Sequence, residues 1–505
     1  MHYTRERMRS GRLPVATRVY QGLGALPEAL KTFAFNTFLL LFYNQVLGLA
    51  ASVASVALLV AVLVDAVTDP LVGSLSDRTR ARLGRRHPYM FAAVVPLGLS
   101  LWLLFSPPGS LTEAGLAVWL GAFAVATRVS MTFFQVPWSA LFVELTDDYV
   151  ERSELVTYRW GFAIIGVALF TALSWAALFQ GTEALPEGQL DRSNYPAFAV
   201  VLAALVAGAA LLTALLTRRE VPYLLQPTDA PAFRLTDAFR DLRLSLRNAN
   251  FRRLFIGLLF TATLTGTVEA TNIYISTYFW ELTPSDLAWY ALAALGAFAG
   301  IAAVPMLNRR YEKRTLLVVG MLASIALGPL LVSLRFLDVL PANGEPALLR
   351  VLVCVEVLRG FLLVIVGTMF VSMTADTADQ QEVRTGLRQE GVFSAAVSFS
   401  NKAISGLGIL FAGLLIDHVI QLGAGVQPGE VPQDTLVRLG VTMGYLVPAL
   451  YLLPLFVLVR YDLTRERHET VIASLEARRI TDADSATTDT TTTEGANHAV
   501  PQATG

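Results

Sequence analysis

Long apolar stretches separated by short polar connections run along most of the chain. A stretch of about 20 apolar residues crosses the hydrocarbon core of a bilayer as one α-helix. Twelve stretches meet this length and predict helices over 29–49, 53–76, 88–106, 114–138, 157–179, 196–217, 254–280, 287–307, 315–334, 347–375, 391–420 and 438–460. The pattern predicts an all-α integral membrane protein.

Lys and Arg residues predict the orientation of these helices, because cytoplasmic loops are enriched in them. They gather after the second and the eighth stretch, at Arg78, Arg80, Arg82, Arg85, Arg86, Arg309, Arg310, Lys313 and Arg314. The connections 107–113 and 281–286, expected on the other side, contain neither residue. We therefore expect a multi-pass protein of the plasma membrane with both termini in the cytoplasm.

One long polar segment divides the stretches into six and six, which is the plan of a two-bundle transporter. The sequence GSLSDRTRARLGRR after the second stretch has a degenerate partner, PMLNRRYEKR, after the eighth, although any cytoplasmic loop of this kind tends to be basic. The expected organisation is a cytoplasmic tail with the start of the first helix (1–28), an N-terminal six-helix bundle (29–217), a cytoplasmic linker (218–253), a C-terminal six-helix bundle (254–460) and a cytoplasmic, largely disordered tail (461–505).

Composition narrows the class of protein further. Hydrophobic residues make up 54% and charged residues 16% of the 505 positions, and the mean hydropathy is +0.53, which is too apolar for a set of soluble domains. The net charge of −1, with arginines confined to loops and tails, argues against nucleic-acid binding. A single cysteine, Cys354, excludes a disulfide framework and a paired-cysteine metal site.

Two aspartates lie deep in the second stretch. Asp65 precedes Arg78 by thirteen residues, so it lies about 20 Å from the cytoplasmic edge, and Asp69 is one helical turn away. Two carboxylates at that depth need a proton, a cation or a basic partner. The pair therefore predicts a cation-coupling site. The alternative is that Asp69, directly before Pro70, caps a kinked helix, while Asp77 and Arg78 merely close the cytoplasmic loop.

The run DAVTDPLVGSLSDRT, residues 65–79, resembles the second-span motif of the glycoside–pentoside–hexuronide:cation symporter family of the major facilitator superfamily. Further blocks are similar in the same order: FYNQVLG (42–48), TFFQVPWSAL (132–141), ADTAD (375–379) and RTGLRQE (384–390). The resemblance implies twelve transmembrane helices in two six-helix bundles. It also implies symport of a small solute with Na⁺ or H⁺ by alternating access, with no other cofactor.

Carried over by position, the family's cation ligands fall on Asp65, Thr68, Asp69 and Thr132, with Na⁺ expected at the two aspartates. The family's eleventh-span lysine falls on Lys402. The alternative is that this side chain snorkels toward the membrane surface, which works poorly for a residue at mid-span.

The resemblance also covers the solute site. Arg159 matches an arginine near the family's sugar site, and Trp138 offers a stacking face. Ala29 and Gln135 stand where sugar-binding members carry aspartates. Gln135 before Val-Pro is also similar to the sodium-dependent lysophospholipid symporters, so a lysolipid or other amphiphile stays an alternative substrate.

Other polar residues within the stretches add candidates for substrate binding or coupling. Glu269 and Asn272 share a helix face, and Asn36 is expected to face them. Arg128 lies one turn before Thr132, so we expect it to pair with Asp65 or Asp69, although Glu356 or a lipid phosphate is an alternative partner. The expected cytoplasmic gate comprises Asp77, Arg78, Arg82, Arg384, Arg388 and Glu390.

Enzyme activity is not expected, because the sequence contains neither an H-E-x-x-H pair nor a G-x-S-x-G elbow. The sequence predicts a secondary active transporter that couples Na⁺ or H⁺ to a small polar solute, such as a sugar or glycoside. Its expected partners are the solute, the cation and membrane lipids, and we expect a monomer.

Overall fold

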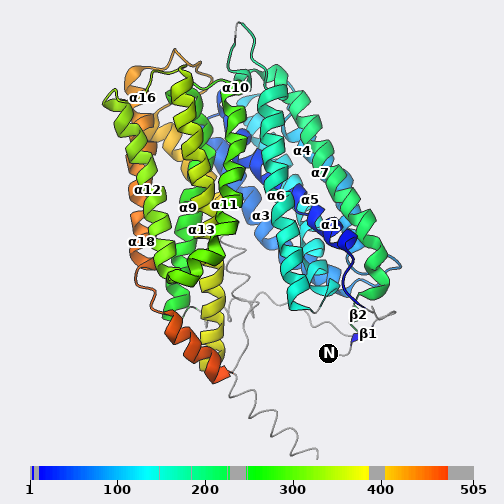
Figure 1. The fold of residues 1–505 in the computed structure, drawn as a ribbon. Helices are drawn as coiled ribbons and strands as arrows, with labels where there is room; N and C mark the ends of the chain where they lie inside the picture. The colour runs from blue at the N-terminus through cyan, green and yellow to red at the C-terminus, as the bar shows by residue number, and fades with distance from the viewer. Residues whose placement is uncertain are drawn as a thin grey trace, which may run out of the picture.

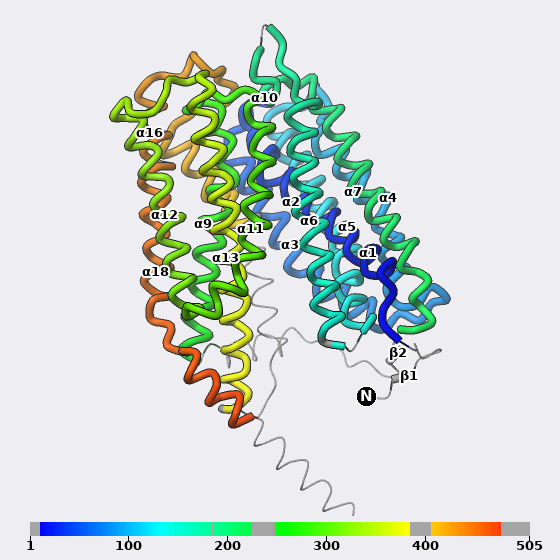
Figure 2. Tube along the Cα trace, in the orientation of Figure 1, coloured from blue at the N-terminus to red at the C-terminus, as the bar shows by residue number. Residues whose placement is uncertain are grey.

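Long helices running side by side form most of the part of the chain that the structure describes (Figure 1). The structure is a computed structural model, and it describes residues 3–4, 11–146, 148–183, 185–224, 226–227, 246, 248–385 and 404–475. Helices from the first half of the chain lie on one side of the molecule and those from the second half on the other (Figure 2).

The first half begins with two short helices and π-helical turns that together form one long apolar segment, Val15–Val46. Its elements are α1 (Val15–Leu23), α2 (Leu26–Ala34), η1 (Phe35–Leu39), η2 (Phe42–Val46), α3 (Ala51–Arg78), α4 (His87–Leu104), α5 (Glu113–Leu145), α6 (Tyr149–Leu173), η3 (Ser174–Leu178), η4 (Gly188–Leu190), η5 (Arg192–Asn194), α7 (Tyr195–Thr217) and η6 (Arg218–Tyr223). A two-residue strand β1 (Tyr3–Thr4) pairs antiparallel with β2 (Gln226–Pro227).

The second half repeats this plan with more interruptions. Its elements are α9 (Ala249–Tyr274), η7 (Ile275–Phe279), α10 (Pro284–Leu287), η8 (Ala288–Leu292), α11 (Ala293–Arg310), α12 (Lys313–Phe336), α13 (Pro346–Thr385), η9 (Ile404–Gly408), α15 (Ile409–Leu414), η10 (Leu415–Ile420), α16 (Gln433–Val441), η11 (Thr442–Leu446), α17 (Val447–Leu450) and α18 (Leu452–Leu458), and a helix over 465–475 follows them.

Ten helices in the described part are long and apolar enough to cross a membrane. The predicted span 347–375 lies within the 40-residue α13. Of the predicted span 391–420, only residues from 404 onward are described, and there Gly406–Ile420 forms a shorter apolar helix. The predicted apolar helices are therefore present wherever the chain is described.

The first helix starts at Val15, earlier than the expected boundary at residue 29. The polar side chains that made this stretch look like a tail are bonded inside the protein. Arg18 forms ion pairs with Glu151 and Glu154 of α6, and Gln21 donates to the carbonyl of Trp138. Internal partners thus replace water for these residues.

Two ends of the molecule can be distinguished in Figure 1. The end where β1 and the helix over 465–475 lie is called the terminal end, and the end where α10 and α16 lie is called the loop end. The side of the membrane that each end faces stays a prediction, with the terminal end expected in the cytoplasm.

Candidate functional site

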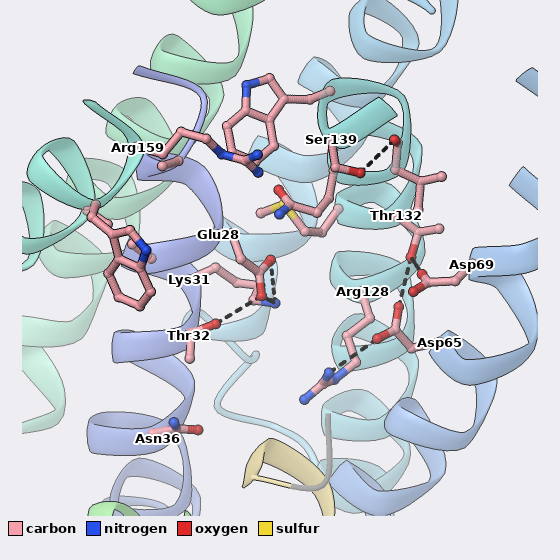
Figure 3. Close-up of a pocket in the computed structure, with 18 of the residues that line it drawn as sticks. Glu28, Lys31, Thr32, Asn36, Asp65, Asp69, Arg128, Thr132, Ser139 and Arg159 are labelled. Carbon is pink, nitrogen blue, oxygen red and sulfur yellow. Dashed lines mark hydrogen bonds and ion pairs between the residues drawn. The ribbon is translucent and has the colours of Figure 1, made fainter. Parts of the chain in front are cut away.

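A cavity of about 850 Å³ lies among the first helical segment, α3, α5 and α6 (Figure 3). It is lined by Ala25, Glu28, Ala29, Lys31, Thr32, Asn36, Asp65, Asp69, Arg128, Met131, Thr132, Gln135, Val136, Trp138, Ser139, Val156, Arg159, Trp160, Ala163 and Glu269. Glu269 of α9 is the member of this set that comes from the second half of the chain. Among the residues that the structure describes, the wall of the cavity is therefore built mainly by the first half.

Asp65 and Asp69 point together toward Thr132 of the neighbouring helix α5 (Figure 3). The Thr132 hydroxyl oxygen lies 2.7 Å from Asp65 Oδ1 and 2.9 Å from Asp69 Oδ1. The one hydrogen of a hydroxyl can be donated fully to only one of these oxygens. Two carboxylates this close also repel each other, so a proton or a cation between them would be stabilised.

Arg128 lies beside the same carboxylates and is 3% exposed. Its Nη1 is 3.6 Å from Asp65 Oδ2, and its guanidinium lies 5.6 Å from the centre of the Phe35 ring. The predicted pairing of Arg128 with an aspartate of α3 is therefore present. One guanidinium against two ionised carboxylates leaves a net charge of −1, which a single monovalent cation would balance.

Thr68, the fourth expected cation ligand, is placed differently. Its hydroxyl donates to the backbone carbonyl of Asp65 at 3.2 Å, and the residue is outside the set that lines the cavity. A Thr hydroxyl that bonds back along its own helix retains lone pairs, so a role for Thr68 toward a cation stays a prediction.

A polar cluster on α2 faces the cavity and was not anticipated from the sequence. Lys31, 5% exposed, has its Nζ 2.8 Å from Oε1 and 2.9 Å from Oε2 of Glu28. The Thr32 hydroxyl donates to Glu28 Oε1 at 3.1 Å. Glu28 therefore supplies a carboxylate directly beside Ala29, the position where sugar-binding relatives were expected to carry one.

Trp138 and Arg159 form a second part of the wall. The Arg159 guanidinium carbon lies 3.8 Å from the centre of the Trp138 ring. Two reciprocal hydrogen bonds with Gln21 fix Trp138. The indole N–H of Trp138 donates to the Gln21 backbone carbonyl at 3.0 Å, and the Gln21 side-chain amide donates to the Trp138 backbone carbonyl at 3.1 Å. Gly24 leaves room for the indole, since a Cβ there would lie 2.0 Å from the indole nitrogen.

Two groups in this region have unused bonding capacity within the part of the chain that the structure describes. Arg159 has no carboxylate within 4.0 Å, and the buried Gln135 Oε1 accepts no hydrogen bond. Buried polar groups in proteins are normally bonded. A ligand with hydroxyl or acidic groups would satisfy both.

Asn36 and Glu269 meet across the two halves of the chain. Asn36 Nδ2 donates to Glu269 Oε2 at 2.6 Å. Asn272, expected beside Glu269, is half-buried on α9 and does not line the cavity.

The expected gate residues separate into two groups. Asp77 forms an ion pair with Arg86 at 2.5 Å. Arg85 and Arg86 both form ion pairs with Glu144 of α5, at 2.8 and 2.9 Å. Arg78 and Arg82 are exposed instead. The ion-pair network near the C-terminal ends of α3 and α5 therefore includes Glu144, which the sequence did not single out because this residue lies near a loop.

The remaining expected residues fall in the last part of α13 and beyond it. Arg384 belongs to α13, although its side chain is not described. Arg388, Glu390 and Lys402 lie outside the described residues.

Comparison with known proteins gives relatives along nearly the whole chain. A model of the family described as MFS/sugar transport protein matches residues 20–465. The uncharacterized symporter YnaJ of Bacillus subtilis (strain 168) is 27% identical over 460 residues, covering 88% of this chain and 90% of that protein. The isoprimeverose transporter of Lactiplantibacillus pentosus is 25% identical and covers 75% of each chain.

A third relative carries a different substrate in its name. The sodium-dependent lysophosphatidylcholine symporter 1 of Gallus gallus is 24% identical, covering 85% of this chain and 83% of that protein. Among solved structures, a bacterial homologue of the human lysosomal transporter Spinster aligns with a TM-score of 0.59 at 13% identity, over 92% of this chain and 99% of that one. The nucleoside transporter NupG aligns with a TM-score of 0.57 at 12% identity, over 88% and 99%.

Proposed function

Because the chain belongs to the MFS/sugar transport protein family, we propose that it is a secondary active transporter that couples Na⁺ or H⁺ to the uptake of a small polar solute. The resemblance to the glycoside–pentoside–hexuronide:cation symporters and the major facilitator fold are thereby confirmed, and the chain is a transporter rather than an enzyme. The solute, the coupling ion and the direction of transport belong to the proposal.

One observation supports ion coupling above all others. Asp65, Asp69 and Thr132 converge in the wall of the cavity, with Arg128 holding one of the two carboxylates. A cation or proton that joins this group removes its remaining negative charge, so binding changes the electrostatics of α3 and α5 together. That change is the event through which an ion gradient would drive transport.

A sugar or glycoside is the favoured solute. Glu28, Gln135 and Arg159 offer charged and neutral hydrogen-bonding groups to hydroxyls, and Trp138 supplies an aromatic ring that holds Arg159 in place. Ligand sites typically combine an apolar wall with a few such polar groups.

A lysolipid or other amphiphile is the second candidate. Val156 and Trp160 line the cavity although they are 40% and 60% exposed, so an apolar part of the wall continues to the outside of the molecule. An acyl chain would fit there with a charged head group near Arg159. The relative with a lysophosphatidylcholine name supports this alternative.

Flux into proteoliposomes tests the proposal. Purified protein is reconstituted, and uptake of labelled sugars, glycosides and lysolipids is measured with a Na⁺ gradient, a pH gradient or neither. We expect one solute class to accumulate only when one of the gradients is imposed. Equal flux with and without gradients, for every solute that binds, would contradict ion coupling.

Asp69→Asn tests the site itself. The amide cannot carry the negative charge that attracts a cation, so we expect gradient-driven accumulation to fall at least tenfold while solute exchange is partly retained, a factor that corresponds to about 1.4 kcal/mol. Undiminished uphill transport by this variant would show that the carboxylate pair is not the coupling site.

A further inference from the structure

Helix α3, which carries Asp65 and Asp69, is capped by a residue from the other half of the chain. Asp417 of η10 accepts a hydrogen bond from the backbone N–H of Ala51 at 3.2 Å with Oδ1, and from that of Ser52 at 2.7 Å with Oδ2. These are the first two N–H groups of α3. The two partners are separated by 366 and 365 residues in the sequence.

The sequence before α3 explains why it needs this partner. Its N-cap residue is Ala50, whose side chain cannot accept a hydrogen bond. Three other long helices, α5, α6 and α9, begin with caps of their own, since the side chains of Thr112, Asp148 and Asn248 each bond to an N–H of the helix that follows. The first N–H groups of a helix carry partial positive charge, so a carboxylate there is stabilising.

Close packing accompanies the cap. Gly413, one turn before Asp417, lies so near α3 that a Cβ would be 2.4 Å from Ser55 Oγ and 2.5 Å from the Ala51 carbonyl oxygen. The second half therefore contacts the start of α3 through backbone as well as through the carboxylate.

A second group of bonds joins the halves near the same end. Gln45 donates to the Gly423 carbonyl at 3.0 Å and accepts from the Val426 N–H at 3.2 Å. Tyr278 donates to Gln45 at 3.1 Å, and Tyr274 donates to Asn44 at 3.2 Å. These contacts close the loop end independently of Asp417.

We propose that Asp417 is a positioning residue for transport, which holds the loop end closed by capping the ion-binding helix α3. Opening of the cavity to the loop end requires the carboxylate to release Ala51 and Ser52. Asp417 therefore makes opening of that end less frequent, alongside the contacts of Gln45 and Tyr278. The inference rests on the proposed function only in taking alternating access as the transport mode.

A labelling experiment tests this without any transport assay. In full-length protein with Cys354→Ser, the substitution Ser55→Cys places a thiol that is fully buried beside Gly413 in the closed state. The rate of reaction with a fluorescent maleimide in detergent then reports opening of the loop end. We expect Asp417→Ala to raise this rate on the order of tenfold, and Asp417→Asn to raise it less because the amide keeps one acceptor oxygen.

Asp286→Ala is the matched control. Asp286 also caps a helix near the loop end, yet its bonds go to Thr283 of its own segment. We expect its labelling rate to equal that of the parent. If the parent, Asp417→Ala and Asp286→Ala have the same melting temperature and the same labelling rate, the proposal is overturned. An equal rise of the labelling rate in both variants also overturns it.

The labelling rate of Asp417→Asn and the gradient-driven flux separate the possible outcomes. If Asp417→Ala does not fold, the rate for Asp417→Asn decides, and an unchanged rate there overturns the proposal. A labelling response without gradient-driven flux of any solute supports the role of Asp417 in opening while contradicting the proposed symport. Normal gradient-driven flux with no labelling response supports the proposed symport and overturns the role of Asp417 in opening.

Discussion

At the scale of single residues, the cavity contains an ion pair whose two members differ in their contact with solvent. The Lys31 side chain is 7% exposed, whereas that of Glu28 is 36% exposed. A buried ammonium group depends on its partner, while a half-exposed carboxylate can be solvated by water. The pair should therefore respond unequally to removal of either charge.

Glu28→Gln and Lys31→Met test this asymmetry. The first leaves the buried ammonium without its counter-charge, and we expect a loss of about 1–3 kcal/mol in the free energy of unfolding. The second leaves a carboxylate within reach of water, so we expect a loss of about 1 kcal/mol or less. Chemical denaturation in detergent micelles measures both, and a larger loss for Lys31→Met would contradict this account.

The sequence predicted the charged residues that stand out against an apolar background. Asp65, Asp69 and Arg128 were found in this way, because each costs free energy in a membrane unless it has a partner. Glu28 was missed because its helix was expected to begin at residue 29 and charges before it looked like a tail, whereas Lys31 lies within the expected span 29–49 and was not singled out. Their bond is an i, i+3 pair, which the spacing alone could have suggested.

At the scale of elements, helices α11 and α13 pack with their backbones nearly in contact. A Cβ on Gly296 would lie 1.8 Å from the Val357 carbonyl oxygen, and one on Gly360 would lie 2.4 Å from that of Ala293. Small residues at helix contacts in membranes allow this approach, and dispersion between the two backbones then stabilises the pair.

Gly296→Ala should separate α11 from α13. The added methyl group meets backbone rather than a movable side chain, so we expect a loss of about 3 kcal/mol, at the upper end for over-packing. Gly367→Ala is the matched control, because a Cβ at this position of α13 meets nothing within 4 Å. A thermal unfolding midpoint lowered equally by both substitutions would show that the contact is not responsible.

Hydrophobic stretches predicted where the helices lie, but not where each one begins and is interrupted. Span length follows from membrane thickness, which the apolar pattern records directly. The start of the first helix at Val15 depends instead on Arg18 and Gln21 finding partners on α6 and α5. The π-helical turns, such as η1 and η2, depend on tertiary packing in the same way, and no local signal marked them.

At the scale of the whole molecule, the described wall of the cavity comes mainly from one half of the chain, and a short hydrogen bond links it to the other half. Glu269 of α9 reaches the wall and accepts from Asn36 at 2.6 Å. Under the proposed function, a solute that contacts this bond would connect binding in the first half to movement of the second.

Glu269→Ala and Glu269→Gln separate the hydrogen bond from the charge. The glutamine keeps an oxygen that accepts from Asn36, so we expect its solute exchange rate to stay near that of the parent. In Glu269→Ala the Asn36 amide loses this acceptor, and we expect the solute exchange rate to fall about tenfold. If the bond is responsible, Asn36→Ala combined with Glu269→Ala is no worse than either change alone. Equal loss in both Glu269 variants would assign the effect to the charge.

The cap on α3 also bears on how the protein is made. A chain synthesised from its N-terminus completes Ala51 and Ser52 hundreds of residues before Asp417 leaves the ribosome. During that interval the start of α3 has no carboxylate partner, and its first N–H groups must bond to water or lipid head groups. Helix α3 is therefore finished at its N-terminus only when almost the entire transporter has been inserted.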